Sequence, residues 1–214
     1  SFRSMREQIT AGLSMAMAGI PWWTSDIGGF LGGEITNPAF RELLVRWFEW
    51  GCFCPVFRMH GERSPWYERE EEFINGVRQL TSGQDNEVWS FGEDNYEILK
   101  KFLFVRENLR GYIRECMRAT AENGTPIMRP LFYDFPQDKQ ACECADEYMF
   151  GDKLLVAPVV GAGAAERSVW LPAGAQWEDA NTHATYDGGQ RVVVPAPIDV
   201  IPVFLRDGAQ LHIY

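Results

Sequence analysis

One segment of the chain combines a carboxylate, two tryptophans and a glycine turn, which is a pattern suited to binding a sugar. Residues 19–30 read GIPWWTSDIGGF, so the neighbouring Trp22 and Trp23 precede the single acid Asp26. Aromatic rings stack on the C–H faces of a pyranose, and a carboxylate accepts hydrogen bonds from its hydroxyls. The alternative is that Asp26 only caps its own turn, as aspartates commonly do.

A second cluster of polar side chains follows at residues 55–61, PVFRMHG. Alternation along a strand would place Arg58 and His60 on the same face, where each can donate a hydrogen bond to a hydroxyl or to a carboxylate. A lone histidine after a strand is more commonly structural, so both interpretations stay open. Alternation also lets only one of two neighbouring tryptophans face a site. We take Trp23 as that residue, and Phe30 as an apolar wall of the pocket.

No convincing pair of catalytic carboxylates is visible in the sequence. A retaining glycosidase needs two carboxyl groups about 5–5.5 Å apart, one as nucleophile and one as acid/base. Asp26 is the only acid within an apolar, aromatic context, whereas Glu34, Glu62 and Asp94 lie in polar segments. We therefore predict substrate-binding residues but no catalytic ones.

Composition narrows the choice of partners. The 214 residues carry a formal charge of −10, which argues against nucleic acid and anionic membranes as partners. The five cysteines are an odd number and favour free thiols in a reducing compartment, so we expect a cytoplasmic location. The two Cys-x-Cys pairs leave a zinc site as the alternative, although neither has the usual wider spacing. We predict no metal and no cofactor.

The first two-thirds of the sequence alternates helical and extended patterns, which is typical of an α/β fold with parallel strands. We expect helices over residues 4–18, from Asn37 onward, and over 95–123. Short strands are expected at 20–23, 53–59 and 125–132. A long polar loop, acid-rich at Glu68–Glu72, should cover 61–93. A long loop inside a compact domain is more often functional than idle.

Short strands separated by turns dominate after about Gly151. They are expected at residues 154–160, 168–171, 176–179, 191–194 and 201–205. This spacing predicts an antiparallel β-sandwich or the edge of a barrel. We therefore divide the chain into an α/β part, residues 1–148, and an all-β part, residues 149–214.

Several of these segments together resemble glycoside hydrolase family 31, the retaining α-glucosidases and α-xylosidases. The resemblance rests on residues 19–30 and 55–61, quoted above, and on four further segments. These are 46–51 (RWFEWG), 124–131 (GTPIMRPL), 154–159 (LLVAPV) and the least specific, 11–17 (AGLSMAM). It covers nearly the whole chain.

The resemblance implies the last strands and helices of a (β/α)₈ TIM barrel followed by a β-sandwich domain. It implies that both catalytic aspartates lie upstream of this segment, in a longer protein that hydrolyses α-linked xylose or glucose. Asp26, His60 and Phe30 would then bind the sugar nearest the cleaved bond, with Arg58 a less direct match. The alternative is a module that binds saccharide, or is merely structural, and catalyses nothing.

A part of a barrel exposes strand edges and apolar faces that its remaining strands should cover. We therefore expect the chain alone to self-associate or to pair with the missing N-terminal part.

Overall fold

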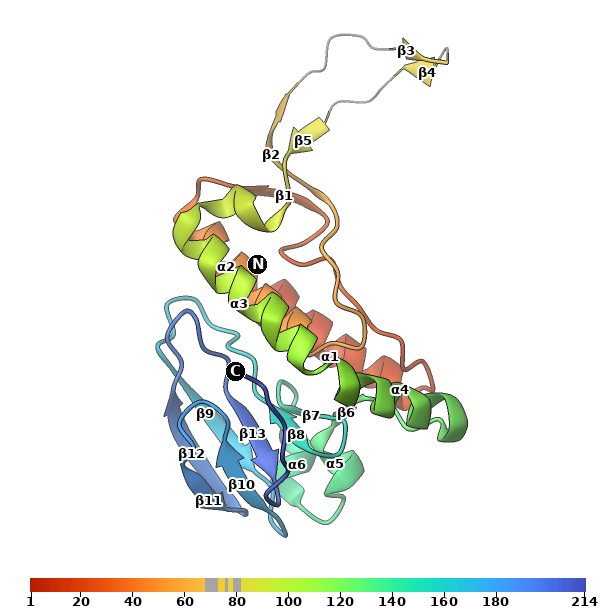
Figure 1. Cartoon of the computed structure of the whole chain (residues 1–214), viewed down its shortest axis with the longest axis vertical. Helices are drawn as coiled ribbons and strands as arrows, with labels where there is room; N and C mark the ends of the chain where they lie inside the picture. Colours follow the sequence, from red (N-terminus) through yellow and green to blue (C-terminus); the bar gives the residue numbers. More distant parts are fainter. Residues whose placement is uncertain (68–72, 76, 79–81) are drawn as a thin grey trace.

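The computed structural model describes residues 1–67, 73–75, 77–78 and 82–214. Four long helices form the middle of the molecule, with the β-rich part at one end and a hairpin at the other (Figure 1). The helices are α1 (Phe2–Met17), α2 (Pro38–Cys52), α3 (Glu93–Asn108) and α4 (Arg110–Asn123). The acid-rich run Glu68–Glu72 lies outside the described residues.

The first two helices follow the sequence signals closely. In α1 the Oγ of Ser1 accepts a hydrogen bond from the backbone N–H of Ser4 at 3.1 Å, and Met5 and Ile9 are fully buried on the inner face. In α2 the Oδ1 of Asn37 caps the helix by accepting from the N–H of Ala39 at 2.9 Å, with a proline in the first turn. Both predicted helices are confirmed.

The single helix predicted over 95–123 is wrong, because the chain divides at Leu109 into α3 and α4. The apolar period continues through the break, and a poor helix former, Gly111, lies two residues beyond it in the first turn of α4. The last residue of α3, Asn108, also donates from its side-chain amide to the carbonyl of Ile213, 3.2 Å away, so a tertiary contact holds this point. The predicted stop at Gly124 is confirmed by its left-handed φ of 72°.

The two strands predicted at 20–23 and 53–59 are absent from the described structure. Their backbones meet through one hydrogen bond, from the N–H of Val56 to the carbonyl of Trp23 at 3.1 Å. Pro21 and Pro55 lack the N–H groups that a continuous ladder would need. The parallel pair in this region is instead β1 (Leu31–Glu34) with β2 (Glu62–Tyr67).

The polar segment 61–93 contains structure that its composition did not indicate. Besides β2 it holds β5 (Ser82–Gln84), which pairs antiparallel with β2, and the hairpin β3 (Phe73–Ile74) with β4 (Val77–Arg78). A 3₁₀ turn, η1 (Val88–Phe91), leads into α3.

The predicted strand 125–132 is confirmed only in part. It contributes β6 (Met128–Pro130) and then turns into the short helix α5 (Leu131–Asp134), followed by α6 (Lys139–Glu143). Proline at 130 ends the strand because it has no donor for a further ladder bond.

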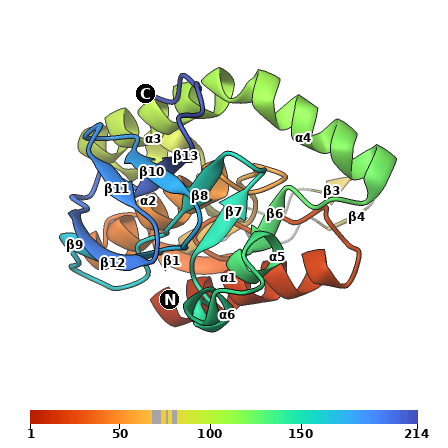
Figure 2. The same cartoon turned by 90° about the horizontal axis from the view of Figure 1, so that it is seen from below.

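The antiparallel architecture predicted for the C-terminal part is confirmed. A six-stranded sheet runs in the order β11-β10-β13-β8-β7-β6, and β9 (Glu166–Leu171) pairs separately with β12 (Gln190–Pro195) (Figure 2). The further strands are β7 (Tyr148–Phe150), β8 (Leu154–Val156), β10 (Gln176–Asp179), β11 (Thr185–Asp187) and β13 (Val203–Arg206). The sheet thus includes β6 and the first residue of β7, which precede the predicted division at residue 149.

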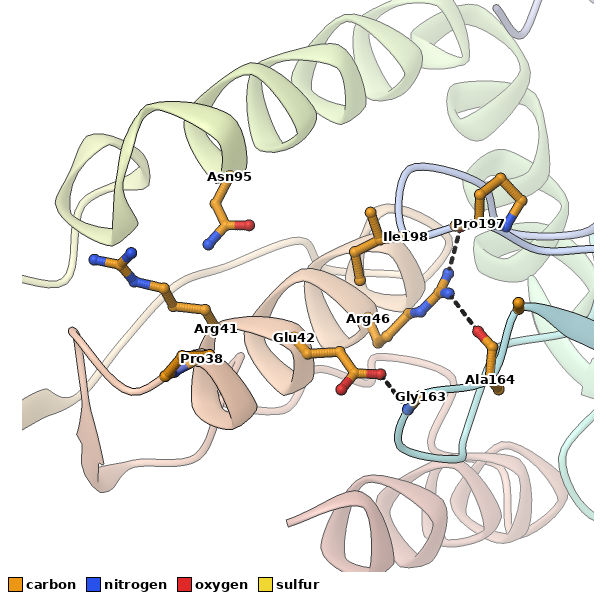
Figure 3. A pocket seen from close by; sticks show the side chains of 10 residues that line it. Pro38, Arg41, Glu42, Arg46, Asn95, Gly163, Ala164, Pro197 and Ile198 are labelled. Atoms are coloured by element: carbon orange, nitrogen blue, oxygen red, sulfur yellow. Dashed lines mark hydrogen bonds between the residues drawn. The ribbon is translucent and has the colours of Figure 1, made fainter.

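Arg46 of α2 joins the helical part to the β-rich part. Its side chain is 2% exposed and donates to Glu49. It also donates to backbone carbonyls in two loops, one between β8 and β9 and the other between β12 and β13. Figure 3 shows it reaching Ala164 and Pro197 beside an open pocket of about 400 Å³. The carbonyl acceptors are those of Ala164, Ala196, Pro197 and Val200, at 2.7–3.1 Å. A buried guanidinium with this many acceptors fixes the two parts against each other.

Over the described ranges, no helix is both long enough and apolar enough to cross a membrane. The same residues hold no group of three or more His, Cys, Asp or Glu side chains that could ligate a metal.

Glu147 provides a pH-dependent element in the β-rich part. Its side chain is 2% exposed, and its Oε2 accepts from the N–H of Trp170 at 2.9 Å. Burial raises the pKa of Glu147 to about 7, against the opposing charge of Arg167. At a pH between the ordinary pKa of a glutamate and about 7, Glu147 is ionised in the unfolded chain but protonated in the folded one. The free energy of unfolding therefore falls as pH rises through this range.

We predict that Glu147→Gln makes folding stability less dependent on pH, because an amide cannot ionise. Its oxygen can still accept from the N–H of Trp170. Wild-type stability should fall by on the order of 2 kcal/mol from this group between about pH 5 and about pH 8. Urea unfolding followed by tryptophan fluorescence measures it. Glu166→Gln, at an exposed acid, is the control, and an unchanged slope in Glu147→Gln would contradict the assignment.

Candidate saccharide site

The turn that follows the double tryptophan forms one side of an open pocket of about 360 Å³. Helix α1 contributes two polar residues, α2 contributes an indole, and the loops contribute the remainder. The lining residues are Ser4, Gln8, Thr24, Ser25, Asp26, Gly29, Phe30, Trp47 and Arg58. Three of the five residues predicted for the site, Asp26, Phe30 and Arg58, therefore share one pocket.

Asp26 and Arg58 form an ion pair inside this pocket. The Nη2 of Arg58 lies 2.6 Å from Oδ1 of Asp26, and the two side chains are 49% and 24% exposed, respectively. One carboxylate oxygen is thus engaged, while Oδ2 remains available to accept from a ligand hydroxyl. The pairing that the sequence suggested for Arg58 is present, and it orients the carboxylate.

Phe30, which lines the pocket, forms an aromatic pair with His60, which lies outside the lining. Their ring centroids are 5.3 Å apart with an interplanar angle of 31°, and both side chains are exposed. The backbones are also joined, because the N–H of Glu62 donates to the carbonyl of Phe30 at 2.9 Å. An apolar ring face next to an imidazole suits the mixed C–H and hydroxyl surface of a sugar.

Trp23 does not line the pocket. Its indole lies against α1, where a Cβ on Gly12 would come within 2.7 Å of the ring. Trp47, which the sequence favoured as helix packing, lines the pocket instead and donates from Nε1 to the Oγ of Ser25 at 2.9 Å. At 3% exposure it serves both as core and as pocket floor. Helical spacing reveals the first role but not the second.

Arg63 is the main residue that the sequence analysis missed. It is fully buried directly beneath the turn, and burial lowers its pKa to about 10, against the opposing effect of Asp26. An arginine three residues after His60 was the only available signal, since three of its four acceptors are backbone carbonyls that no residue type reveals.

Among the lining residues that the structure describes, Asp26 is the only carboxylate. Glu34 and Glu62 lie on β1 and β2, outside this lining, and Asp94 lies at the start of α3. The arrangement can therefore bind and orient a polyhydroxyl ligand, whereas two-carboxylate hydrolysis would need a further acid from outside it.

Comparison with known families agrees with this arrangement. The family model described as "Glycosyl hydrolases family 31 TIM-barrel domain" matches residues 1–115. The model described as "Glycosyl hydrolase family 31 C-terminal domain" matches residues 124–211. The chain therefore belongs to glycoside hydrolase family 31.

Individual relatives are similar over nearly all of this chain. The α-xylosidase of Saccharolobus solfataricus is 36% identical over 208 residues, covering 97% of this chain and 26% of that protein. A family 31 α-xylosidase from a soil metagenome, solved with xylose, superposes with a TM-score of 0.94 at 53% identity, covering 98% of this chain and 31% of that one. A dextranase of Flavobacterium johnsoniae, solved with glucose, gives 0.84 at 34% identity, covering 99% and 24%. The chain spans a quarter to a third of these proteins' lengths.

A substitution at Gly61 would show whether the backbone fixes the position of Phe30 in its pair with His60. The φ of Gly61 is +109°, and a Cβ there would overlap the carbonyl oxygen of Phe30. We predict that Gly61→Ala costs about 3 kcal/mol of folding stability and weakens sugar binding, because Phe30 must move.

Gly174→Ala is the matched control, since Gly174 has a φ of +88° but nothing within 4 Å of its Cβ position. It should cost about 1 kcal/mol and leave sugar affinity unchanged. Denaturant unfolding and xylose titration measure the two quantities. Equal effects of the two substitutions would show that Phe30 is not confined by residue 61.

Proposed function

We propose that this chain is part of a retaining α-glycosidase that releases terminal α-linked xylose or glucose from oligosaccharides. Within that enzyme, this segment binds the sugar at the subsite nearest the cleaved bond. The observation that carries the proposal is the Asp26–Arg58 pair facing a pocket bounded by Phe30. The names of similar proteins, α-xylosidases and a dextranase, support the same reaction class.

Each site residue has a distinct role in this proposal. Asp26 accepts hydrogen bonds from sugar hydroxyls through its free carboxylate oxygen, and Arg58 fixes that carboxylate. His60 hydrogen-bonds a hydroxyl, while Phe30 covers a C–H face. Trp23, predicted as a fifth binding residue, supports the turn through its packing on α1.

The chemical step in this proposal belongs to two carboxyl groups upstream of this segment, one as nucleophile and one as acid/base. The residues here contribute by placing the sugar so that its anomeric carbon meets those groups in a productive geometry. We favour xylosides over glucosides, since a soil-metagenome α-xylosidase is 53% identical over this region.

A non-catalytic saccharide-binding module is the second candidate, favoured by the single carboxylate in the pocket lining. Calorimetry of the isolated chain with xylose, glucose and isoprimeverose distinguishes it. Heat at millimolar sugar from the isolated chain, together with no hydrolysis of α-xylosides or α-glucosides by the full-length protein, would support the module, and the absence of heat would exclude it. A cytoplasmic location is also proposed, from the free thiols.

Substituting Asp26 tests the proposed function directly. In the full-length enzyme that contains this segment, Asp26→Ala should lower kcat/KM for an aryl α-xyloside by about 10²-fold or more, with folding retained. Glu34→Gln, at an exposed acid of β1, is the control and should leave the rate unchanged. Hydrolysis is followed by release of the aryl group. Full activity of Asp26→Ala would return Asp26 to a purely structural role.

Exposed apolar side chains support the proposed association of the isolated chain. Trp22, Leu31, Trp89 and Phe104 are between 58% and 67% exposed. We expect the chain alone to form dimers or larger species, because burying such surface is favourable. Light scattering over a range of concentrations measures the mass, and a stable monomer throughout would contradict the expectation.

A further inference from the structure

Arg63 occupies an unusual position, because it is a fully buried cation whose hydrogen-bond partners are all neutral. Its side chain lies at the second residue of β2, directly below the turn that contains Asp26 and Phe30. Nη2 donates to the carbonyl of Ile27 at 2.7 Å, and Nη1 to that of Gly29 at 2.8 Å. Nη1 also reaches the carbonyl of Gly32 at 3.2 Å.

The remaining face of the guanidinium is also occupied. Nε donates to Oδ1 of Asn86 at 2.8 Å, and the side-chain amide of Asn86 donates in turn to the carbonyl of Gly61 at 3.2 Å. The ring of Phe40 lies 5.3 Å from the guanidinium carbon, as in a cation–π contact. Arg63 therefore connects the turn, the segment next to His60 and the loop after β5.

Burying a guanidinium without a carboxylate partner is costly unless many dipoles compensate for the lost water. Here two carbonyls of the turn and that of Gly32 in β1 accept from the same cation, so the cation and the turn conformation stabilise each other. Without Arg63, these carbonyls would lose their common donor and the turn would have to rearrange.

The two functional residues are the immediate sequence neighbours of residues whose carbonyls accept from Arg63. Asp26 immediately precedes Ile27, and Phe30 immediately follows Gly29, so each is one residue from an atom held by Arg63. Displacing either carbonyl moves the adjacent side chain relative to Arg58 or His60.

We propose that Arg63 is the positioning residue of the sugar site, holding Asp26 and Phe30 where a pyranose can contact both. This inference rests on the proposed function. Arg63 touches no sugar itself and acts only through the backbone of the turn.

The test uses the full-length enzyme, an aryl α-xyloside as substrate and free xylose as competitive inhibitor. Arg63→Met removes every donor at similar length, and Asn86→Ala removes one contact of Arg63 while leaving the buried cation in place. Arg129→Met is the matched control. That arginine is 5% exposed in β6 and is bound to Asp134 and to the carbonyl of Pro126.

We expect Asn86→Ala to raise the inhibition constant of xylose about tenfold, and Arg63→Met to lower kcat/KM about 10²-fold. Arg129→Met should lower the melting temperature comparably while xylose affinity stays within about twofold. If the two arginine variants lose similar stability but only Arg63→Met loses xylose affinity and activity, Arg63 acts by positioning the site. General destabilisation would affect both variants alike.

Xylose affinity within about twofold of wild type in both Asn86→Ala and Arg63→Met would overturn the inference while leaving the proposed function intact. If Arg63→Met fails to fold, Asn86→Ala decides alone. A wild-type enzyme that hydrolyses no α-xyloside or α-glucoside would instead overturn the proposed function, and this inference with it.

Discussion

The site depends on one buried cation. Arg63 is fully excluded from solvent, and its guanidinium donates to the carbonyls of Ile27 and Gly29 in the turn and of Gly32 in β1. Asp26 and Phe30, the neighbours of the held residues Ile27 and Gly29, both line the pocket. A turn rich in glycine can adopt many shapes, so a fixed central donor is needed to select one of them.

Several features could be predicted because the interactions that create them are local. The cap at Asn37, the proline after it and the apolar period of α1 each act within a few residues, and the helices follow these signals. The pairing of Arg58 with a carboxylate was also anticipated from the chemistry of its guanidinium, and the partner is Asp26. The alternating pattern after Gly151 likewise indicated antiparallel strands.

Other features depend on contacts that no local pattern encodes. Residues 20–23 and 53–59 lie side by side but share one backbone bond, because Pro21 and Pro55 interrupt the donors. Strand alternation therefore failed to predict which tryptophan faces the pocket. Trp47 lines it from a helix, whereas Trp23 packs on α1. The break at Leu109 combines a local signal, Gly111, with a tertiary contact of Asn108 to Ile213 that the apolar period does not reveal.

A crystal structure of the full-length protein with bound xylose would test the central claim most directly. The account predicts the sugar in the pocket between α1 and the turn. One hydroxyl would lie within hydrogen-bond distance of the Asp26 carboxylate, another within reach of His60, and the ring beside Phe30. Xylose bound elsewhere, with Asp26 paired only to Arg58, would contradict the assignment of this pocket as the sugar site.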